Sequence, residues 1–199
     1  MKTKDFFYDL PEQLIAQTPV EPRDSSRLMI YDRHSKTVYH EVFNQLPKYL
    51  KKGDVLVIND TKVIPARIHG TKKGTGGKVE FLLLKRIDYT KWEVLLKPGR
   101  IARPGAVFEF GENLSAKVLE IVQDGARIVE FSFNGIFEDV LAQIGEMPLP
   151  PYIKEKLNDQ NRYNTIYSKD GCSAAAPTAG LHFTKSLMDE IEKKGVQIE

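Results

Sequence analysis

The sequence predicts an α/β domain interrupted by an inserted antiparallel β-barrel. Within residues 62–147, six short β-rich runs follow one another with turn signals between them, which is typical of a barrel or sandwich. The flanking segments, 1–61 and 148–199, mix helix and strand patterns, and we expect them to form one discontinuous domain. A chain of 199 residues with 41% hydrophobic residues is long enough for two modest cores.

The first segment predicts a short helix and several strands. Residues 10–15 carry a brief apolar helical face. Residues 28–32 and 37–42 are expected to pair as strands around a polar turn. Residues 54–59 (DVLVIN) form a nearly continuous apolar run, which is typical of a strand covered on both faces.

The predicted barrel strands are separated by turns rich in Gly, Asn, Asp and Pro. The six runs are 63–69, 78–86, 92–96, 106–110, 116–122 and 127–133. Residues 136–144 then return to helical spacing, and Gly145 is expected to end that helix.

The last segment returns to mixed structure. Residues 148–151 (PLPP) cannot continue a helix and predict a stiff connector, and 162–167 is a candidate short strand. Thr184 is expected to cap a helix over 185–194. Residues 196–199 then begin a strand with little room to finish, so we expect a fragment truncated at its C-terminus.

The charge distribution is uneven although the net charge is only +2. Residues 62–104 hold eleven Lys or Arg against three Asp or Glu, whereas 105–150 hold two against eight. The basic stretch could meet a phosphate backbone. Alternatively, its lysines protect strand edges from aggregation.

Composition excludes several classes of protein. The single cysteine, Cys172, allows no internal disulfide and no Cys-based zinc site. No apolar run approaches the roughly 20 residues of a membrane span, and the charged N-terminus lacks the apolar stretch of a signal peptide. We therefore expect a cytoplasmic protein that does not bind a membrane.

A glycine-rich stretch, KKGTGGK at 72–78, is superficially similar to a phosphate-binding loop. No Ser or Thr follows its last lysine, and the next segment is a strand rather than a helix. A turn between two barrel strands is the better interpretation. A Rossmann-type nucleotide site is excluded for the same reason.

Three polar or small-residue loops are candidate binding segments. In the first, Arg23 and Arg27 flank Asp24 and suit anion or ribose contacts, or else form an Arg–Asp pair. In the second, residues 59–67 follow the carboxyl end of a predicted strand, where ligands often bind, unless Asn59 or Asp60 simply makes an Asx turn. The third, residues 173–184, is rich in Ala and Gly, so its backbone can approach a ligand closely.

Four strings, in order along the chain, resemble the S-adenosylmethionine:tRNA ribosyltransferase-isomerase family of the queuosine pathway. They are EPRDSSRL (21–28), NDTKVIPAR (59–67), GEMPLPPY (145–152) and AAAPTAGLHFT (174–184). The sequence departs from the family at Lys62, where Arg is usual, and at Cys172, where Gly is usual.

The resemblance implies an α/β domain with an inserted barrel and an enzyme that consumes S-adenosylmethionine as a co-substrate. Its ribosyl part would move onto 7-aminomethyl-7-deazaguanine in tRNA, giving epoxyqueuosine-tRNA with release of adenine and methionine. The sulfonium acidifies the ribose 5′ protons, so a modest base could generate an ylide that attacks the deazaguanine ring. No other cofactor and no metal are implied, and we expect a monomer. The alternatives are a non-catalytic RNA-binding barrel module and an inactive fragment of the enzyme.

The matching strings also indicate site residues. Candidates for proton transfer are Asp60, Glu146 and His182, because each can titrate; a lone histidine is, however, often only a structural hydrogen-bonding group. Candidates for binding S-adenosylmethionine are Arg23, Arg27, Asn59, Thr61, Pro177, Thr178, Gly180, Phe183 and Thr184. Candidates for contacting tRNA phosphates are Lys72, Lys73, Lys78, Arg100 and Arg103.

Overall fold

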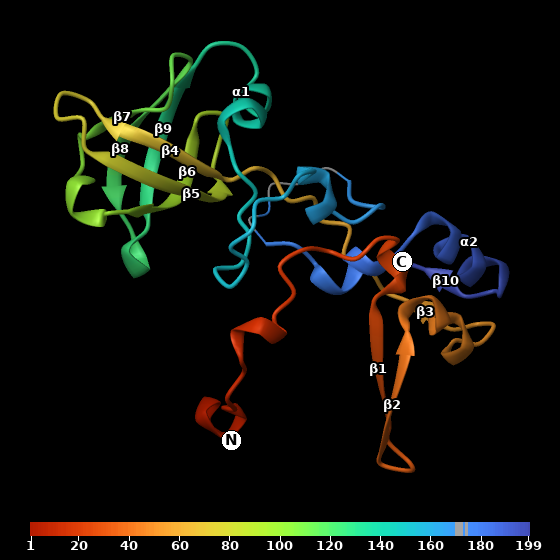
Figure 1. Ribbon diagram of the computed structural model, residues 1–199. Coiled ribbons are helices and arrows are strands. Elements are labelled where there is room, and N and C mark those ends of the chain that lie inside the picture. The colour runs from red at the N-terminus through yellow and green to blue at the C-terminus, as the bar shows by residue number, and fades with distance from the viewer. Residues whose placement is uncertain (170–172, 174) are drawn as a thin grey trace.

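The computed structural model describes residues 1–169, 173 and 175–199, and its largest element is a closed antiparallel β-barrel (Figure 1). The strand order around the barrel is β4-β5-β6-β9-β8-β7. The predicted antiparallel barrel is therefore confirmed. Its strands are β4 (Arg67–Lys72), β5 (Lys78–Arg86), β6 (Lys91–Lys97), β7 (Val107–Glu109), β8 (Leu114–Ile121) and β9 (Arg127–Phe133).

The barrel encloses an aromatic core, because alternate residues of each strand point inward. Phe81 meets Phe108 and Phe110 edge to face, with ring centroids 5.3 and 4.9 Å apart. Helix α1 (Phe137–Ile144) covers part of this core, and the Phe137 ring centroid lies 5.2 Å from that of Phe131. The helix predicted at 136–144 is confirmed.

A long β-hairpin stands apart from the barrel (Figure 1). Strands β1 (Arg27–Asp32) and β2 (Thr37–Val42) pair antiparallel over their whole length, as predicted. Asp32 Oδ1 accepts hydrogen bonds from the backbone N–H groups of His34 and Ser35, which fixes the connecting turn.

A second, smaller core joins segments that are far apart in the sequence. Phe43, in the 3₁₀ segment η4 (Phe43–Tyr49), packs edge to face against Phe183. Leu187 and Ile191 of α2 (Lys185–Lys193) complete this core. Thr184 caps α2 as predicted: its hydroxyl accepts a hydrogen bond from the Leu187 N–H.

The predicted strand over 54–59 is shorter and more exposed than expected. Only β3 (Val55–Leu56) is a strand, and it pairs in parallel with β10 (Gln197–Ile198). Val55 and Val57 are 52% and 78% exposed. The expectation of a strand covered on both faces is wrong, because the face that carries Val55 and Val57 is exposed while Leu56 and Ile58 on the other face are half-buried.

Three further local predictions are corrected. The strand expected at 63–69 begins at Arg67, because Pro65 precedes it and has no N–H for a ladder. The region 162–167 forms no strand; it overlaps the 3₁₀ turn η7 (Gln160–Tyr163), which Asp159 caps. The segment 10–15 forms only the turn η2 (Glu12–Leu14), and two of its apolar side chains, Leu10 and Leu14, are 44% and 70% exposed.

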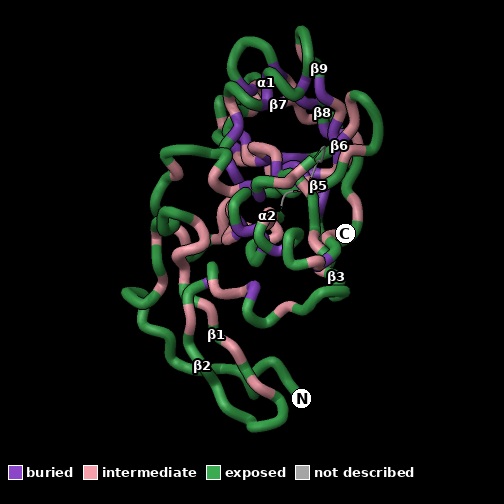
Figure 2. The backbone as a smooth tube through the Cα atoms, turned by 90° about the vertical axis from the view of Figure 1, so that its right-hand side faces the viewer, coloured by how far each residue is buried: buried purple, intermediate pink, exposed green. Residues whose placement is uncertain are grey.

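The remaining short elements are all 3₁₀ turns: η1 (Thr3–Phe6), η3 (Arg23–Ser25), η5 (Gly99–Ile101), η6 (Gln123–Gly125) and η8 (Thr178–His182). Burial concentrates in the barrel, whereas the β1–β2 hairpin is mostly exposed or half-buried (Figure 2). In the part of the chain that the structure describes, no helix is long and apolar enough to cross a membrane.

Candidate functional site

A cavity of about 560 Å³ lies where three distant segments meet. The segment before and at the start of β1 forms one wall, the connector that follows the predicted Pro-rich stretch forms another, and η8 forms the third. Most of the lining is apolar, with a few polar side chains among it, which is the usual character of a small-molecule site. The polar side chains in the lining include Ser26, Arg27, Arg162, Thr178 and His182.

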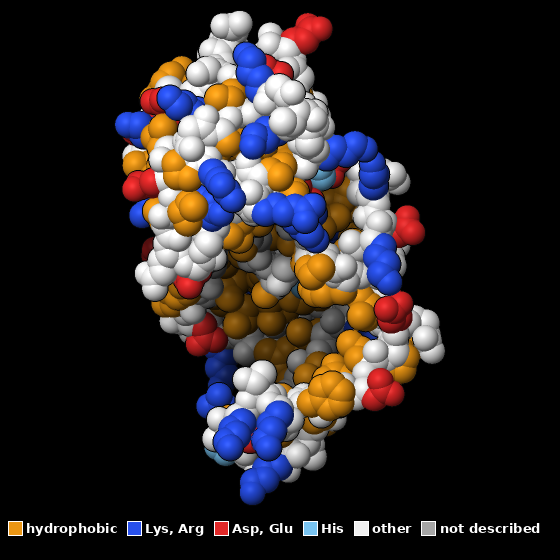
Figure 3. Space-filling model, turned by 90° about the vertical axis from the view of Figure 1, so that its left-hand side faces the viewer, with side chains coloured by type: hydrophobic (Ala, Val, Ile, Leu, Met, Phe, Trp, Pro, Cys, Tyr) orange, Lys and Arg blue, Asp and Glu red, His pale blue; other side chains and the backbone are white. Residues whose placement is uncertain are grey.

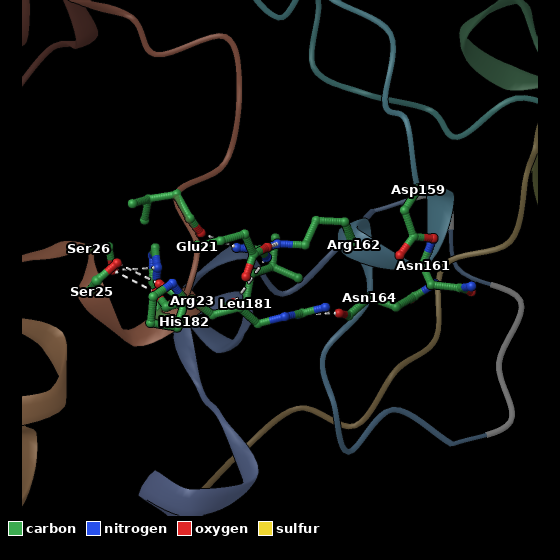
Figure 4. Close-up of polar contacts among 12 residues, drawn as sticks. Glu21, Arg23, Ser25, Ser26, Asp159, Asn161, Arg162, Asn164, Leu181 and His182 are labelled. Carbon is green, nitrogen blue, oxygen red and sulfur yellow. Dashed lines mark hydrogen bonds and ion pairs between the residues drawn. The ribbon is translucent and has the colours of Figure 1, made fainter.

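His182 is held in the cavity wall by a relay of hydrogen bonds (Figure 4). Its Nδ1 lies 2.8 Å from Ser26 Oγ, and that hydroxyl donates to the Arg23 carbonyl at 3.2 Å. When the Ser26 hydroxyl donates to the Arg23 carbonyl, Nδ1–H of the neutral ring is the donor to Ser26 and Nε2 keeps its lone pair; the other tautomer of His182 reverses these roles.

The surroundings of His182 favour this neutral ring. Burial lowers the pKa of His182, and the nearby Arg162 guanidinium lowers it further, while a hydrogen bond with the Arg23 backbone acts in the opposite direction. The ring also packs against Phe43, with centroids 5.2 Å apart. At neutral pH, His182 is suited to accept a proton.

Arg162 and Asn164 organise the wall, and the sequence pattern singled out neither. The Arg162 side chain is 12% exposed, pairs with the Glu21 carboxylate and donates to the Val20 carbonyl at 2.9 Å. The Asn164 side chain bonds both the N–H and the carbonyl of Val63, at 2.7 and 3.0 Å. Both residues lie in a polar stretch with no distinctive spacing, so only the folded contacts reveal them.

Arg23 and Arg27 have different surroundings. The Arg23 Nη1 donates to the Asn164 carbonyl at 2.7 Å, and burial lowers the pKa of Arg23. Arg27 lines the cavity. The alternative Arg–Asp pair is not present among the described contacts, since Asp24 instead accepts a hydrogen bond of 2.8 Å from the Thr184 hydroxyl.

The loop from 173 onward contributes backbone and small side chains. Thr178 lines the cavity, and Gly180 is buried behind it. A Cβ at Gly180 would lie 2.2 Å from the Tyr167 hydroxyl, so only glycine fits without displacement. Pro177 precedes η8 directly, whereas Phe183 packs in the second core and Thr184 caps α2. Cys172 and Ala174 lie outside the described residues.

The segment 59–61 does not line this cavity. Asn59 Oδ1 accepts a hydrogen bond of 2.9 Å from the Thr61 N–H, which is the Asx turn considered above. Asp60 lies on the surface, with its carboxylate 3.6 Å from the Lys169 ammonium.

Glu146 lines a second cavity, of about 370 Å³. This cavity shares three lining residues, Leu149, Ile153 and Leu157, with the first. The two cavities therefore adjoin, with His182 in one and Glu146 in the other.

The predicted phosphate contacts gather near one end of the barrel. Residues 72–78 form the turn between β4 and β5, as the strand context predicted. A Cβ at Gly77 would lie 3.7 Å from Ile101 of η5, so this turn lies beside the segment that carries Arg100 and Arg103. Of these basic residues, Lys73 pairs with Glu109 at 3.3 Å.

No metal centre accompanies these cavities: within ranges 1–169 and 175–199 and at 173, no three His, Cys, Asp or Glu side chains lie close enough to hold an ion. The fold and the site define a β-barrel protein with a mostly apolar cavity that loops form beside the barrel. A family model for queuosine biosynthesis proteins matches residues 3–199. The chain belongs to this family.

Curated relatives carry more specific names. S-adenosylmethionine:tRNA ribosyltransferase-isomerase from Acetivibrio thermocellus is 57% identical over 199 residues, which is 100% of this chain and 58% of that protein. The protein of the same name from Caldanaerobacter subterraneus is 55% identical over 198 residues, 99% of this chain and 58% of that protein. The chain thus spans somewhat over half the length of these relatives.

A solved structure is also similar. The crystal structure of S-adenosylmethionine tRNA ribosyltransferase from Thermotoga maritima is 34% identical, and the match covers 98% of this chain and 56% of that one with a TM-score of 0.39.

Proposed function

We propose that this chain carries the S-adenosylmethionine site of a tRNA ribosyltransferase-isomerase, which moves the ribosyl part of S-adenosylmethionine onto 7-aminomethyl-7-deazaguanine in tRNA and releases adenine and methionine. One observation supports this most strongly. Three of the four family strings, through Arg27, Leu149 and His182, line a single cavity. The fourth string reaches the adjoining cavity through Arg67.

His182 is our candidate for the base. A proton on the ribose 5′ carbon is acidified by the neighbouring sulfonium, so a neutral imidazole can remove it. In the tautomer whose Nδ1–H donates to Ser26, Nε2 is free to accept that proton. The apolar walls favour the adenosyl group and exclude water, while Arg27 and Thr178 offer polar contacts to ribose or carboxylate.

Asp60 is a weaker candidate for proton transfer. It lies outside both cavities and faces the Lys169 ammonium in water. Substituting Asp60 and His182 separately therefore distinguishes the two candidates.

We also propose the domain organisation that the sequence predicts: residues 1–61 with 148–199 as one domain, and 62–147 as the inserted barrel. The parallel pairing of β3 with β10 and the packing of Phe43 on Phe183 support it, because both join the two ends of the chain. We further propose that the protein acts on tRNA as a monomer in the cytoplasm.

The basic end of the barrel is the proposed tRNA contact. Lys72, Lys78, Arg100 and Arg103 lie on the two neighbouring segments there. Changing Lys78 to Gln should weaken tRNA binding and reduce the slope of log affinity against log salt by about 0.7. Lys117→Gln, in the acidic half of the barrel, is the control; equal slopes for both variants would place the tRNA elsewhere.

Release of free adenine tests the activity. We expect the Acetivibrio thermocellus relative to release adenine from S-adenosylmethionine only with tRNA that carries the precursor base. The change equivalent to His182→Gln should abolish release, whereas the change equivalent to Asp60→Asn should not. The same assay on this chain shows whether the 58% of the relative's length that it spans is sufficient. Full activity after the histidine change would refute the assigned base.

A further inference from the structure

The second cavity has a charged wall built by a backbone bridge between β4 and the segment after α1. The Arg67 N–H donates to the Glu146 carbonyl at 3.1 Å, and the Glu146 N–H donates to the Arg67 carbonyl at 2.8 Å. Residues that exchange both hydrogen bonds in this way project their side chains to the same face. A guanidinium and a carboxylate therefore stand next to each other on the cavity wall.

Gly145 fixes this arrangement. A Cβ at this position would lie 2.1 Å from the Pro65 carbonyl oxygen and 2.6 Å from the Leu141 carbonyl oxygen. Only glycine allows the chain to leave α1 so close to the segment that leads into β4. The bridge from Glu146 to Arg67 depends on that close approach.

Within the described chain, neither charged group has all of its hydrogen-bonding capacity satisfied. Arg67 Nε is buried without a hydrogen-bond partner, and its nearest carboxylate, Glu80, is 3.6 Å away. Glu146 Oε2 lies 3.6 Å from His69 Nε2 and accepts no side-chain hydrogen bond among the described residues. A guanidinium and a carboxylate with free capacity can bind a ligand edge that carries both donors and an acceptor.

The rest of the cavity is partly apolar and partly charged. Its lining combines the apolar side chains of Met147, Leu149, Ile153 and Leu157 with the polar or charged side chains of Lys154, Glu155, Lys156 and Gln160. Apolar side chains provide the stacking surface that an unstacked nucleobase needs.

We propose that this cavity binds the Watson–Crick edge of a guanine-type base presented by RNA. The Glu146 carboxylate accepts hydrogen bonds from N1–H and from the 2-amino group, and Arg67 donates to O6. A 7-deazaguanine keeps this edge and loses only N7, so the proposal deepens the proposed function and rests on it. The three shared side chains place such a base beside the S-adenosylmethionine cavity.

The outer face of the barrel leads from this cavity toward the basic end. Arg67, His69 and Thr71 alternate along β4 on one face, and Thr71 pairs with Lys78 on β5. On the same sheet, Glu80 of β5 pairs with Lys97 of β6. Figure 3 shows Lys and Arg side chains on the barrel part of the molecule, at the rim of a hollow lined by hydrophobic side chains. RNA phosphates can therefore lie on the face that carries Arg67.

The test compares two RNA hairpins that differ by one amino group. Their loops carry either 7-deazaguanine or 7-deazahypoxanthine, which lacks the 2-amino group, at the same position. We expect this chain to bind the first about tenfold more tightly. Glu146→Gln should bind both equally, because an amide cannot accept both hydrogen bonds. Glu155→Gln, on the same cavity, is the control and should keep the preference.

Two outcomes would overturn the proposal. One is a Glu146→Gln variant that still binds S-adenosylmethionine, and is therefore folded, yet keeps the full preference between hairpins. The other is a loss of S-adenosylmethionine affinity in both Glu146→Gln and Arg67→Met with unchanged affinity for 5′-methylthioadenosine, which would assign the charged pair to the methionyl group. Failure of the proposed function is separate: hairpin discrimination by this chain, together with no adenine release by the Acetivibrio thermocellus relative, refutes the activity but leaves the base site standing.

Discussion

The barrel and the segments around it differ in how they bury apolar side chains. The barrel closes its own hydrogen-bond ladder around Phe81, Phe108 and other aromatic residues. The surrounding segments bury only a small core around Ile191, while Met29 and Val57 stay 70% and 78% exposed. Figure 2 shows the same contrast along the backbone. Stability therefore concentrates in the barrel, and the cavities form from loops around it, which is a common arrangement of rigid scaffold and functional loops.

Truncation of a barrel aromatic should show the largest difference between the two regions. Phe81 is fully buried, so Phe81→Ala should lower the free energy of unfolding by about 3–5 kcal/mol. Met29→Ala, on the exposed face of the hairpin, should change it by less than about 0.5 kcal/mol. Urea unfolding followed by tryptophan fluorescence measures both, since Trp92 lies in the barrel. Similar decreases in the free energy of unfolding for both variants would show that stability is not concentrated in the barrel.

Adding a methyl group at Gly180, in the loop region, should lower the free energy of unfolding by less than Phe81→Ala does. Gly180→Ala places a Cβ 2.2 Å from the Tyr167 hydroxyl and 2.9 Å from Thr165 Cγ2, and overpacking of this kind costs about 1–3 kcal/mol. Adding Tyr167→Phe removes the nearest atom and should restore part of the loss. A double variant no more stable than Gly180→Ala would show that the loop adjusts in another way.

Loss of the α2 cap should cost about 1 kcal/mol. The Thr184 hydroxyl accepts from the Leu187 N–H at 3.3 Å and donates to Asp24 at 2.8 Å, so Thr184→Ala removes both bonds. Thr184→Ser keeps the hydroxyl and should remain close to the original stability. Thermal unfolding of the three proteins distinguishes a cap from a methyl contact, because a methyl contact would make Ser as harmful as Ala.

The smallest effect concerns pH. Burial and the Arg162 cation lower the pKa of His182 in the folded chain, so the unfolded chain binds the proton more readily. Stability should therefore decrease as pH falls from the ordinary histidine pKa of about 6.5 through the lower folded value. His182→Gln should remove this part of the pH dependence. An unchanged profile in that variant would assign the dependence to other groups.

Local signals predicted the barrel strands well, because four of the six pairings in the barrel join consecutive strands; β6–β9 and β4–β7 close the barrel between strands farther apart in the chain. The hairpin at 28–42 and the helix that Thr184 caps follow from equally local signals. The prediction for 54–59 was wrong because an apolar run indicates a strand but does not show whether both of its faces are buried. Local pattern determines local structure, whereas burial depends on distant partners.

The candidate sites show the same limit. The family strings located Arg27, Thr178 and His182, which line one cavity. They did not reveal Arg162 or Asn164, whose hydrogen bonds to Val20 and Val63 join segments more than a hundred residues apart. Asn59 and Asp60 belong to a matching string but lie outside both cavities, because an Asx turn and a surface ion pair account for their side chains.

Strand β4 also fixes the distance between the second cavity and the basic end of the barrel. Arg67 at its start faces the second cavity, and Thr71, four residues on, pairs with Lys78 near the basic end. At roughly 3.3 Å per residue, the strand separates these two points by about 13 Å. In a nucleic acid bound along β4, the distance between the base in the cavity and the phosphates at the basic end would be set by the strand, which cannot stretch. One inserted residue would alter that spacing and turn every later side chain to the opposite side.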